Sequence, residues 1–171
     1  SGAKTVYVKL FNADGVGTAI SLSDGSKTGL SSAVKVSSGT ATGLVLTIPT
    51  TTPPATFDVG AEFLLTIEVV DSYGNPKEIV SGIHSVTFSG PLSSPAPSSS
   101  SPIYASSSNG SNTTSFTFTS GKTNVHVKLF NADATGTAIS ATGPYGATGS
   151  STAIKVNSGS LASFTLVPST T

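Results

Sequence analysis

Two histidines, His84 and His126, are the candidates for a general base in this chain. A hydrolase would need a nucleophile and an orienting acid arranged around one of them. Both histidines fall where apolar and polar residues alternate, a pattern typical of β-strands. His126 is also replaced by Tyr7 in a second copy of its segment, so one copy does without it. We predict surface or cross-strand histidines, no catalytic residues, and a protein that is not an enzyme.

A calcium site is the next chemistry to consider, because calcium takes several oxygen ligands from converging loops. Asp71 and Asn75 in the turn DSYGNP could offer two such ligands, and Asp133 a third. The turn lacks the acidic density of a dedicated calcium loop, and Asp and Asn are ordinary turn residues. No phosphate-binding glycine motif stands between a strand and a helix. We predict no metal and no cofactor.

A Lys–Asn isopeptide crosslink, found in some surface β-sandwiches, would require a buried lysine beside an asparagine and an acid. Lys9 and Lys128 fall on the polar side of their alternating segments. Asn157 is replaced by Ser37 in the second copy. The sequence therefore gives little support to such a crosslink.

Two adjacent Asn-x-Ser/Thr triplets, at Asn109 and Asn112, are candidate glycosylation sites. Such triplets also arise by chance in this chain, because Ser and Thr contribute 31 and 25 of its 171 residues. A neutral, hydroxyl-rich surface is common among extracellular glycoproteins. Asn109 and Asn112 are the site residues that the sequence proposes.

Composition excludes several classes of partner. Charged residues make up 9% of the chain, eight lysines balance eight acids, and arginine is absent. Nucleic acid is excluded as a partner, because phosphate recognition relies on Arg and on net positive charge. No apolar run approaches the roughly 20 residues of a membrane span. Cysteine is absent as well, so disulfides contribute nothing.

The heptapeptide VKLFNAD occurs twice, at 8–14 and at 127–133. Residues 1–52 align with residues 120–171, with Leu10 on Leu129, and the offset is 119 residues over most of the match. Two correlated copies at one offset indicate a tandem repeat, in which each repeat combines a front part and a back part. The front part is residues 53–119; residues 1–52 and 120–171 are two back parts.

Period-2 alternation dominates both parts, and Gly, Pro, Asn and Asp mark the turns between the alternating segments. Short strands at this spacing predict an all-β fold of antiparallel Ig-like β-sandwich modules in tandem. The predicted core consists of the inward residues of these strands: Phe63, Leu65, Ile67, Val69, Phe116, Phe118, Val125, Val127, Leu129, Phe164 and Leu166.

The repeat also predicts the domain organisation. Residues 1–52 should be the C-terminal half of a module whose front half is missing, and residues 53–171 a complete module. The Ser/Pro-rich stretch 91–115 should be an irregular, exposed loop inside that module. The proline-bearing stretch 49–56 should be the junction between modules. A rival topology makes 1–90 a self-sufficient sandwich, with 91–115 as its outgoing linker.

The segments FLLTIEVVDSYGNP, SVTFSGP, VHVKLFNAD and SGSLASFTLVPSTT resemble the Ig-like repeats of very long bacterial and archaeal cell-surface proteins. The resemblance covers the whole chain and implies an extracellular β-sandwich in a stalk, adhesin or filament. It carries over no catalytic residues. The expected function is structural, in an extracellular fibre or cell-surface stalk; the alternative is an adhesive or glycan-binding module.

The orphan back part predicts a partner. Its apolar strand faces include Val6, Val8 and Leu10, and unpaired strands and apolar faces tend to find another chain. We expect a front part to complete it, either by strand donation from a neighbouring subunit or by continuity of a longer polypeptide. Donation would give head-to-tail self-association into a filament.

Overall fold

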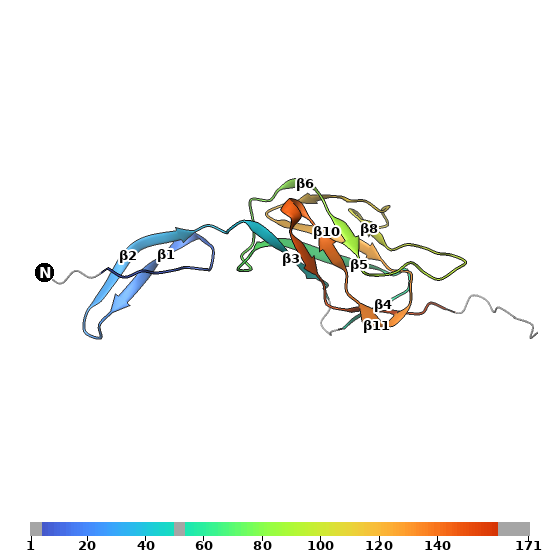
Figure 1. Ribbon diagram of the computed structural model, residues 1–171, viewed down its shortest axis with the longest axis horizontal. Coiled ribbons are helices and arrows are strands. Elements are labelled where there is room, and N and C mark those ends of the chain that lie inside the picture. The colour runs from blue at the N-terminus through green and yellow to red at the C-terminus, as the bar shows by residue number, and fades with distance from the viewer. Residues whose placement is uncertain (1–4, 50–53, 161–171) are drawn as a thin grey trace, which may run out of the picture.

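The computed structural model describes residues 5–49 and 54–160 (Figure 1). Near the N-terminus, β1 (Asp14–Ser23) and β2 (Thr28–Val36) form an antiparallel hairpin that extends away from the remaining strands. Those remaining strands build a β-sandwich, and one 3-10 turn, η1 (Pro144–Gly146), interrupts them. The predicted all-β sandwich fold is confirmed.

The larger sheet of the sandwich has the strand order β7-β12-β13-β3-β5-β10-β8. Its neighbours pair antiparallel except β13 and β3, which run parallel. The bounds of its strands are β3 Ala41–Thr47, β5 Glu62–Asp71, β7 Thr87–Ser89, β8 Ile103–Ala105, β10 Lys122–Lys128, β12 Ser140–Thr142 and β13 Thr148–Ser150.

The other layer contains a three-stranded sheet of order β11-β14-β4 and a two-stranded pair of β6 and β9. Here β4 runs parallel to β14, and the other pairs are antiparallel. The bounds are β4 Ala55–Asp58, β6 Gly82–Ser85, β9 Ser115–Phe118, β11 Asp133–Thr137 and β14 Ile154–Asn157.

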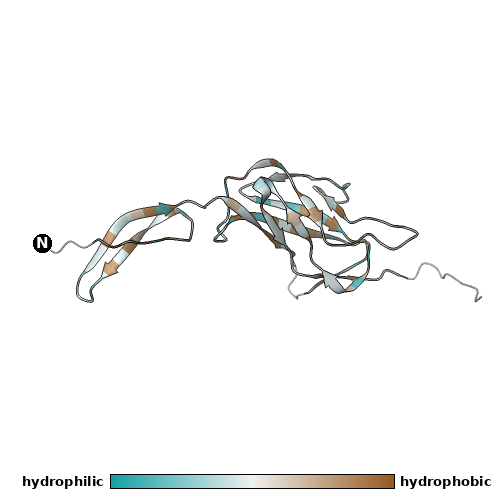
Figure 2. Cartoon of the chain, viewed as in Figure 1, coloured by the Kyte–Doolittle hydropathy of each residue, from teal (hydrophilic) through white to brown (hydrophobic). Residues whose placement is uncertain are grey.

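Alternation places one face of each strand in the core, because successive side chains of a strand point to opposite faces. In β5 and β10, Leu65, Ile67, Val125 and Val127 are fully buried, and β9 adds Phe116 from the other layer. Figure 2 shows the hydrophobic residues concentrated on the strands, including those of the hairpin. All predicted core residues up to Leu129 are confirmed as buried; Phe164 and Leu166 lie outside the described residues.

The observed sandwich begins before the expected module junction at 49–56, because β3 is one of its strands. β3 belongs in sequence to the first back part, yet it pairs with β5 along Ala41–Thr47 and buries Leu44 and Leu46 in the sandwich core. The rival topology is wrong, because β10 of the second copy lies beside β5 in the same sheet. The division into 1–52 and 53–171 remains a prediction, and residues 5–36 stand outside the sandwich (Figure 1).

The stretch 91–115 is not irregular throughout, and this part of the prediction is wrong. Ile103–Ala105 form β8, which pairs with β10 at the edge of the large sheet. Tyr104 and Ala105 are buried, and the Tyr104 ring stacks on Phe88 at a centroid distance of 4.2 Å. The Ser/Pro-rich composition around this short strand masked its alternation.

Candidate docking site

The two copies of the repeat adopt the same local structure at the acidic residue that ends VKLFNAD. The Asp14 carboxylate accepts hydrogen bonds from the Gly17 N–H (2.8 Å) and the Thr18 hydroxyl (2.7 Å). Asp133 accepts the equivalent bonds from the Gly136 N–H (2.9 Å) and the Thr137 hydroxyl (2.6 Å). The Thr137 hydroxyl is the main cause that holds the pKa of Asp133 well below its usual range.

Strand pairing repeats as well. Asp14 lies opposite Val36 in the hairpin, and Asp133 lies opposite Val156 in the sandwich. Both pairs include a register shift before the next partner, which is Thr18 opposite Val34 in the first copy. The β1–β2 hairpin therefore matches the β11–β14 pair, and the copies differ in their surroundings.

The surroundings decide the burial of identical side chains. Val125, Val127 and Leu129 are 0%, 0% and 4% exposed. Their equivalents Val6, Val8 and Leu10 are 66%, 52% and 45% exposed. The segment that carries the exposed set is not a strand, although the same segment of the second copy is β10, because β10 has β5 and β8 as its neighbours.

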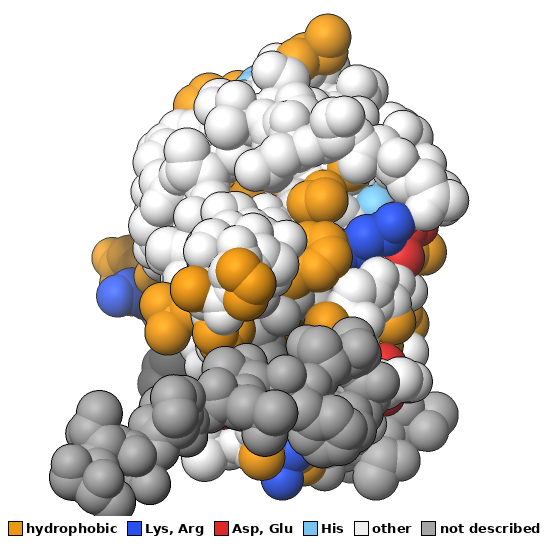
Figure 3. Space-filling model, turned by 90° about the vertical axis from the view of Figure 1, so that its right-hand side faces the viewer, with side chains coloured by type: hydrophobic (Ala, Val, Ile, Leu, Met, Phe, Trp, Pro, Cys, Tyr) orange, Lys and Arg blue, Asp and Glu red, His pale blue; other side chains and the backbone are white. Residues whose placement is uncertain are grey.

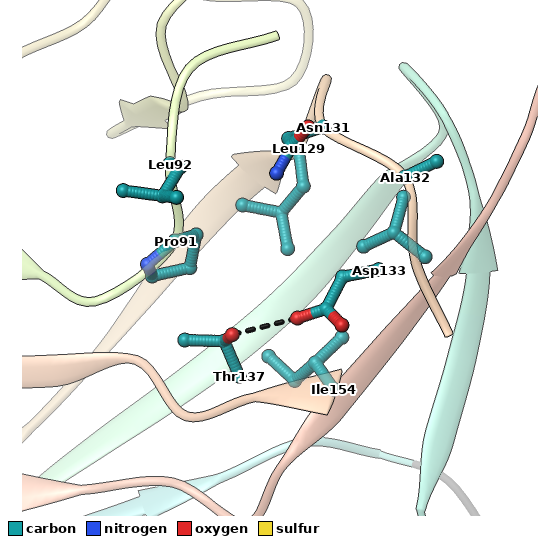
Figure 4. Close-up of a pocket in the computed structure, with 9 residues that line it drawn as sticks. Pro91, Leu92, Leu129, Asn131, Ala132, Asp133, Thr137 and Ile154 are labelled. Atoms are coloured by element: carbon teal, nitrogen blue, oxygen red, sulfur yellow. Dashed lines mark hydrogen bonds between the residues drawn. The ribbon is translucent and has the colours of Figure 1, made fainter. Parts of the chain in front are cut away.

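A hollow of about 270 Å³ marks the place where the front part covers the second copy (Figure 4). Pro91 and Leu92 of the front part line one side of the hollow and approach Leu129. The opposite side is formed by the back part, from Asp133, hydrogen-bonded to Thr137, and the Ile154 side chain.

An equivalent groove of about 390 Å³ lies open on the first copy. Residues of the first copy line it at the positions of their counterparts in the second: Leu10, Asn12, Asp14, Thr18, Val34 and Val36. Among the residues that the structure describes, no segment takes the place of Pro91 and Leu92 here, nor that of β4 beside β2. We name this surface the hairpin groove.

A second contact ties the hairpin to the sandwich through the turn that follows β5. The Asn75 amide donates to the Phe11 carbonyl (2.8 Å) and accepts from the Ala13 N–H (2.9 Å). The Asp71 carboxylate accepts from the Gly39 N–H (2.7 Å), and Lys77 Nζ donates to the Ser38 carbonyl (3.2 Å). We name residues 71–77 the clamp loop.

The clamp loop is built to hold these groups. Asp71 and Asn75 are buried, and the Asn75 backbone N–H donates to Asp71 Oδ1 at 2.9 Å. The Asn75 side chain and the Gly39 N–H hold the pKa of Asp71 well below its usual range, so its carboxylate stays ionised. Tyr73 packs against Phe11 at a centroid distance of 5.0 Å. The loop therefore binds backbone groups of the chain both before β1 and after β2.

A cluster of polar side chains surrounds Glu62 at the start of β5. Its carboxylate accepts hydrogen bonds from the Asn109 N–H (2.7 Å), the Ser108 hydroxyl (2.7 Å) and His126 Nδ1 (2.9 Å). These bonds lower the pKa of Glu62 to about 2, with the Asn109 N–H as the largest cause. The cluster fastens the 107–110 turn to the large sheet.

Lys128 also reaches this cluster, and its Nζ lies 2.7 Å from Asn109 Oδ1 and 3.7 Å from Glu62. Isopeptide formation would need an uncharged amine and a protonated acid, which burial away from water favours. Here Glu62 is held ionised and Asn109 is exposed. Asn157 is not part of the cluster, because its amide donates to Asp58 (3.0 Å).

The remaining candidates for chemistry are dispersed. His84 lies on β6 against the Phe118 ring and contacts the Ser81 carbonyl at 3.2 Å, whereas His126 bonds Glu62 on the neighbouring strand. Over residues 5–49 and 54–160, no group of three or more His, Cys, Asp or Glu side chains could hold a metal ion. Asp133, proposed as a ligand beside Asp71, is occupied by its own turn.

The glycosylation candidates lie on the surface. Asn109 and Asn112 are both exposed. Asn112 Oδ1 accepts from the Tyr104 N–H at 3.0 Å, and within the described part of the chain its Nδ2, the atom to which a glycan attaches, makes no hydrogen bond. Asn109 Nδ2 approaches the Ser108 hydroxyl at 3.4 Å. Glycosylation at either residue stays a prediction.

Sequence reasoning missed the clamp loop as a binding element. The sequence identifies DSYGNP as a turn and offers its carboxylate and amide only as metal ligands. The groups that they hold are backbone N–H and carbonyl groups of Phe11, Ala13 and Gly39, which no side-chain pattern reveals.

No family model matches this chain, and no curated protein matches it. A β-glycosidase structure from Bacteroides vulgatus is similar to the chain at a TM-score of 0.50 and 14% identity. The match covers 75% of this chain and 15% of that one. A glycoside hydrolase family 2 β-glucuronidase is similar at a TM-score of 0.44 and 22% identity, over 74% of this chain and 12% of that one. At these identities, the first likeness shows a shared β-sandwich fold and the chain spans a small part of the larger enzyme.

Proposed function

We propose that the chain is a structural segment of an extracellular fibre or cell-surface stalk built of tandem Ig-like modules. In this function each front part packs on a back part, and the hairpin groove is the docking site for one more front part. Its occupant is a segment like residues 53–119. The Pro-Leu pair of that segment fills the groove, and its β4-like strand pairs with the free edge of β2. The proposal rests on one observation, the burial of VKLFNAD in the second copy and its exposure in the first.

The packing of the second copy favours continuity of one polypeptide over donation by an identical chain. The front part at 53–119 already covers residues 120–157. A neighbour that gave its front part to the hairpin would uncover its own second copy. A front part that precedes the hairpin in the same polypeptide leaves no back part uncovered. Head-to-tail association of separate subunits into a filament would need a partner with a spare front part.

An extracellular location belongs to this proposal and is supported by the low charge and the hydroxyl-rich composition. Among the described residues, no helix is long and apolar enough to cross a membrane. Glycans at Asn109 or Asn112 would add to the solubility of such a surface.

The test is to place a second copy of residues 40–119 directly before Ser1. That copy supplies a β3-like strand and a front part, so the hairpin should become the second half of a complete module. Hydrogen exchange of the amides of Val6, Val8 and Leu10 should slow by at least about tenfold relative to the original chain.

A matched control carries Leu65→Asp and Ile67→Asp in the added copy alone, because these substitutions place charges in the face that should cover the hairpin. The control should leave the three amides unprotected. Unchanged exchange in the extended chain, with the added copy itself folded, would contradict the proposal.

A further inference from the structure

The clamp loop holds four backbone groups of the first copy. They are the Phe11 carbonyl, the Ala13 N–H, the Gly39 N–H and the Ser38 carbonyl, at distances from 2.7 to 3.2 Å. A Cβ atom at Gly39 would stand 3.3 Å from Asp71 Oδ2, so the loop closes tightly over this glycine.

The repeat presents the same four groups at the other end of the sandwich. FNA occurs at 11–13 and again at 130–132, and SG occurs at 38–39 and again at 158–159. In the second copy, no hydrogen bond to the Phe130 carbonyl, the Ala132 N–H or the equivalent groups of 158–159 occurs within the described residues. A Cβ atom at Gly159 would meet nothing within 4 Å, in contrast to Gly39.

The turn and the strand pair next to FNA have the same local structure in both copies. Asp133 and Asp14 order the turn after FNA with the same hydrogen bonds, and the two strand pairs share their register. Phe130 lies beside Gly60, and a Cβ atom at Gly60 would stand 3.6 Å from the Phe130 ring. Binding would therefore require little ordering of the backbone, which keeps its entropic cost small.

We infer that residues 130–132 and 158–159 form a docking site for the clamp loop of a further front part, which continues the array beyond this module. The partner is a buried Asp-x-x-x-Asn-x-Lys loop whose carboxylate is ionised. This inference rests on the tandem function proposed above and adds the site at which one module is oriented on the next.

The surface fits a partner of this kind. Figure 3 views the molecule from the right-hand side of Figure 1, where β11 lies, and uncharged side chains dominate the described part of that face. Recognition at 130–132 and 158–159 would come from hydrogen bonds to backbone groups, as it does at 11–13 and 38–39. The order of segments along the chain agrees with this. In the first copy, SG at 38–39 precedes β3, the first strand of the sandwich whose clamp loop binds it. In the second copy, SG at 158–159 precedes the segment SLASFTLV.

The experiment appends a second copy of residues 53–157 after Thr171 and measures amide hydrogen exchange in the whole chain. The amides of Ala132 and Gly159 should exchange at least about tenfold more slowly than in the 171-residue chain. Asn75→Ala in the appended copy should restore fast exchange at Ala132. The same substitution in the resident copy is the matched control, and it should free Ala13 and leave Ala132 protected.

Two results would overturn the inference. One is an appended copy that folds, with its own Ile67 amide protected, while Ala132 and Gly159 exchange as before. This outcome would leave the tandem function intact, since that function is tested separately at the N-terminal end. The other is an appended copy that stays unfolded, because the same segment folds when it follows residues 1–52.

Discussion

Leu10 and Leu129 occupy the same position of VKLFNAD and provide an internal comparison of burial. Leu129 is 4% exposed in the sandwich, and Leu10 is 45% exposed beside the hairpin. Replacing Leu129 with Ala removes a buried side chain and should lower the free energy of unfolding by about 2–5 kcal/mol. Replacing Leu10 should cost about 1 kcal/mol or less, because 45% of its surface stays in contact with water after folding.

Urea denaturation followed by circular dichroism and tyrosine fluorescence would measure both changes. The chain has no Trp, and Tyr104, stacked on Phe88, reports on the sandwich. With a slope of about 2 kcal/mol per molar urea, Leu129→Ala should lower the midpoint by about 1–2.5 M. The shift for Leu10→Ala should stay below about 0.5 M.

The same pair tests the completion of the hairpin. In the chain extended by residues 40–119 before Ser1, Leu10 becomes a core residue, and Leu10→Ala should then cost about 2–5 kcal/mol, as Leu129→Ala does. Equal costs for Leu10→Ala and Leu129→Ala in the original chain would refute the reasoning, since they would mean that the hairpin is already covered.

Three further outcomes are expected. Ile67→Ala should destabilise the sandwich by about 2–5 kcal/mol in the same urea assay, and a loss below about 0.5 kcal/mol would mean that the inward face is assigned wrongly. Glu62 has a pKa lowered from 4.5 to about 2, so its stabilising contribution is present above pH 4.5 and is lost as the pH falls toward 2; Glu62→Gln should flatten the pH dependence of stability in that window. The intact mass of native material should exceed that of the bare polypeptide because of sugar at Asn109, Asn112 or nearby hydroxyls, and a bare polypeptide mass would contradict this.

Much of the sandwich follows from alternation along the chain. Segments such as FLLTIEVV and NVHVKLF have one apolar face each, and burial of that face is the main favourable term that a strand can gain. The core positions of β5, β9 and β10 were therefore predictable residue by residue. β8 was not, because three residues with one buried aromatic give too short an alternation to stand out in a Ser/Pro-rich stretch.

The docking surfaces depend on tertiary structure to different degrees. By itself, the sequence determined that the chain contains two copies of one segment, one before and one after the front part at 53–119. Only the tertiary structure decided which copy is covered, because Val8 and Val127 share a heptapeptide and differ by half of their surface in exposure. The tertiary structure also decided that β3 joins the sandwich, where the edges of β5 and β13 are free to pair with it. The contacts of the clamp loop were likewise decided by the tertiary structure. The loop binds backbone groups that are far away in sequence, and local residue patterns do not predict such pairs.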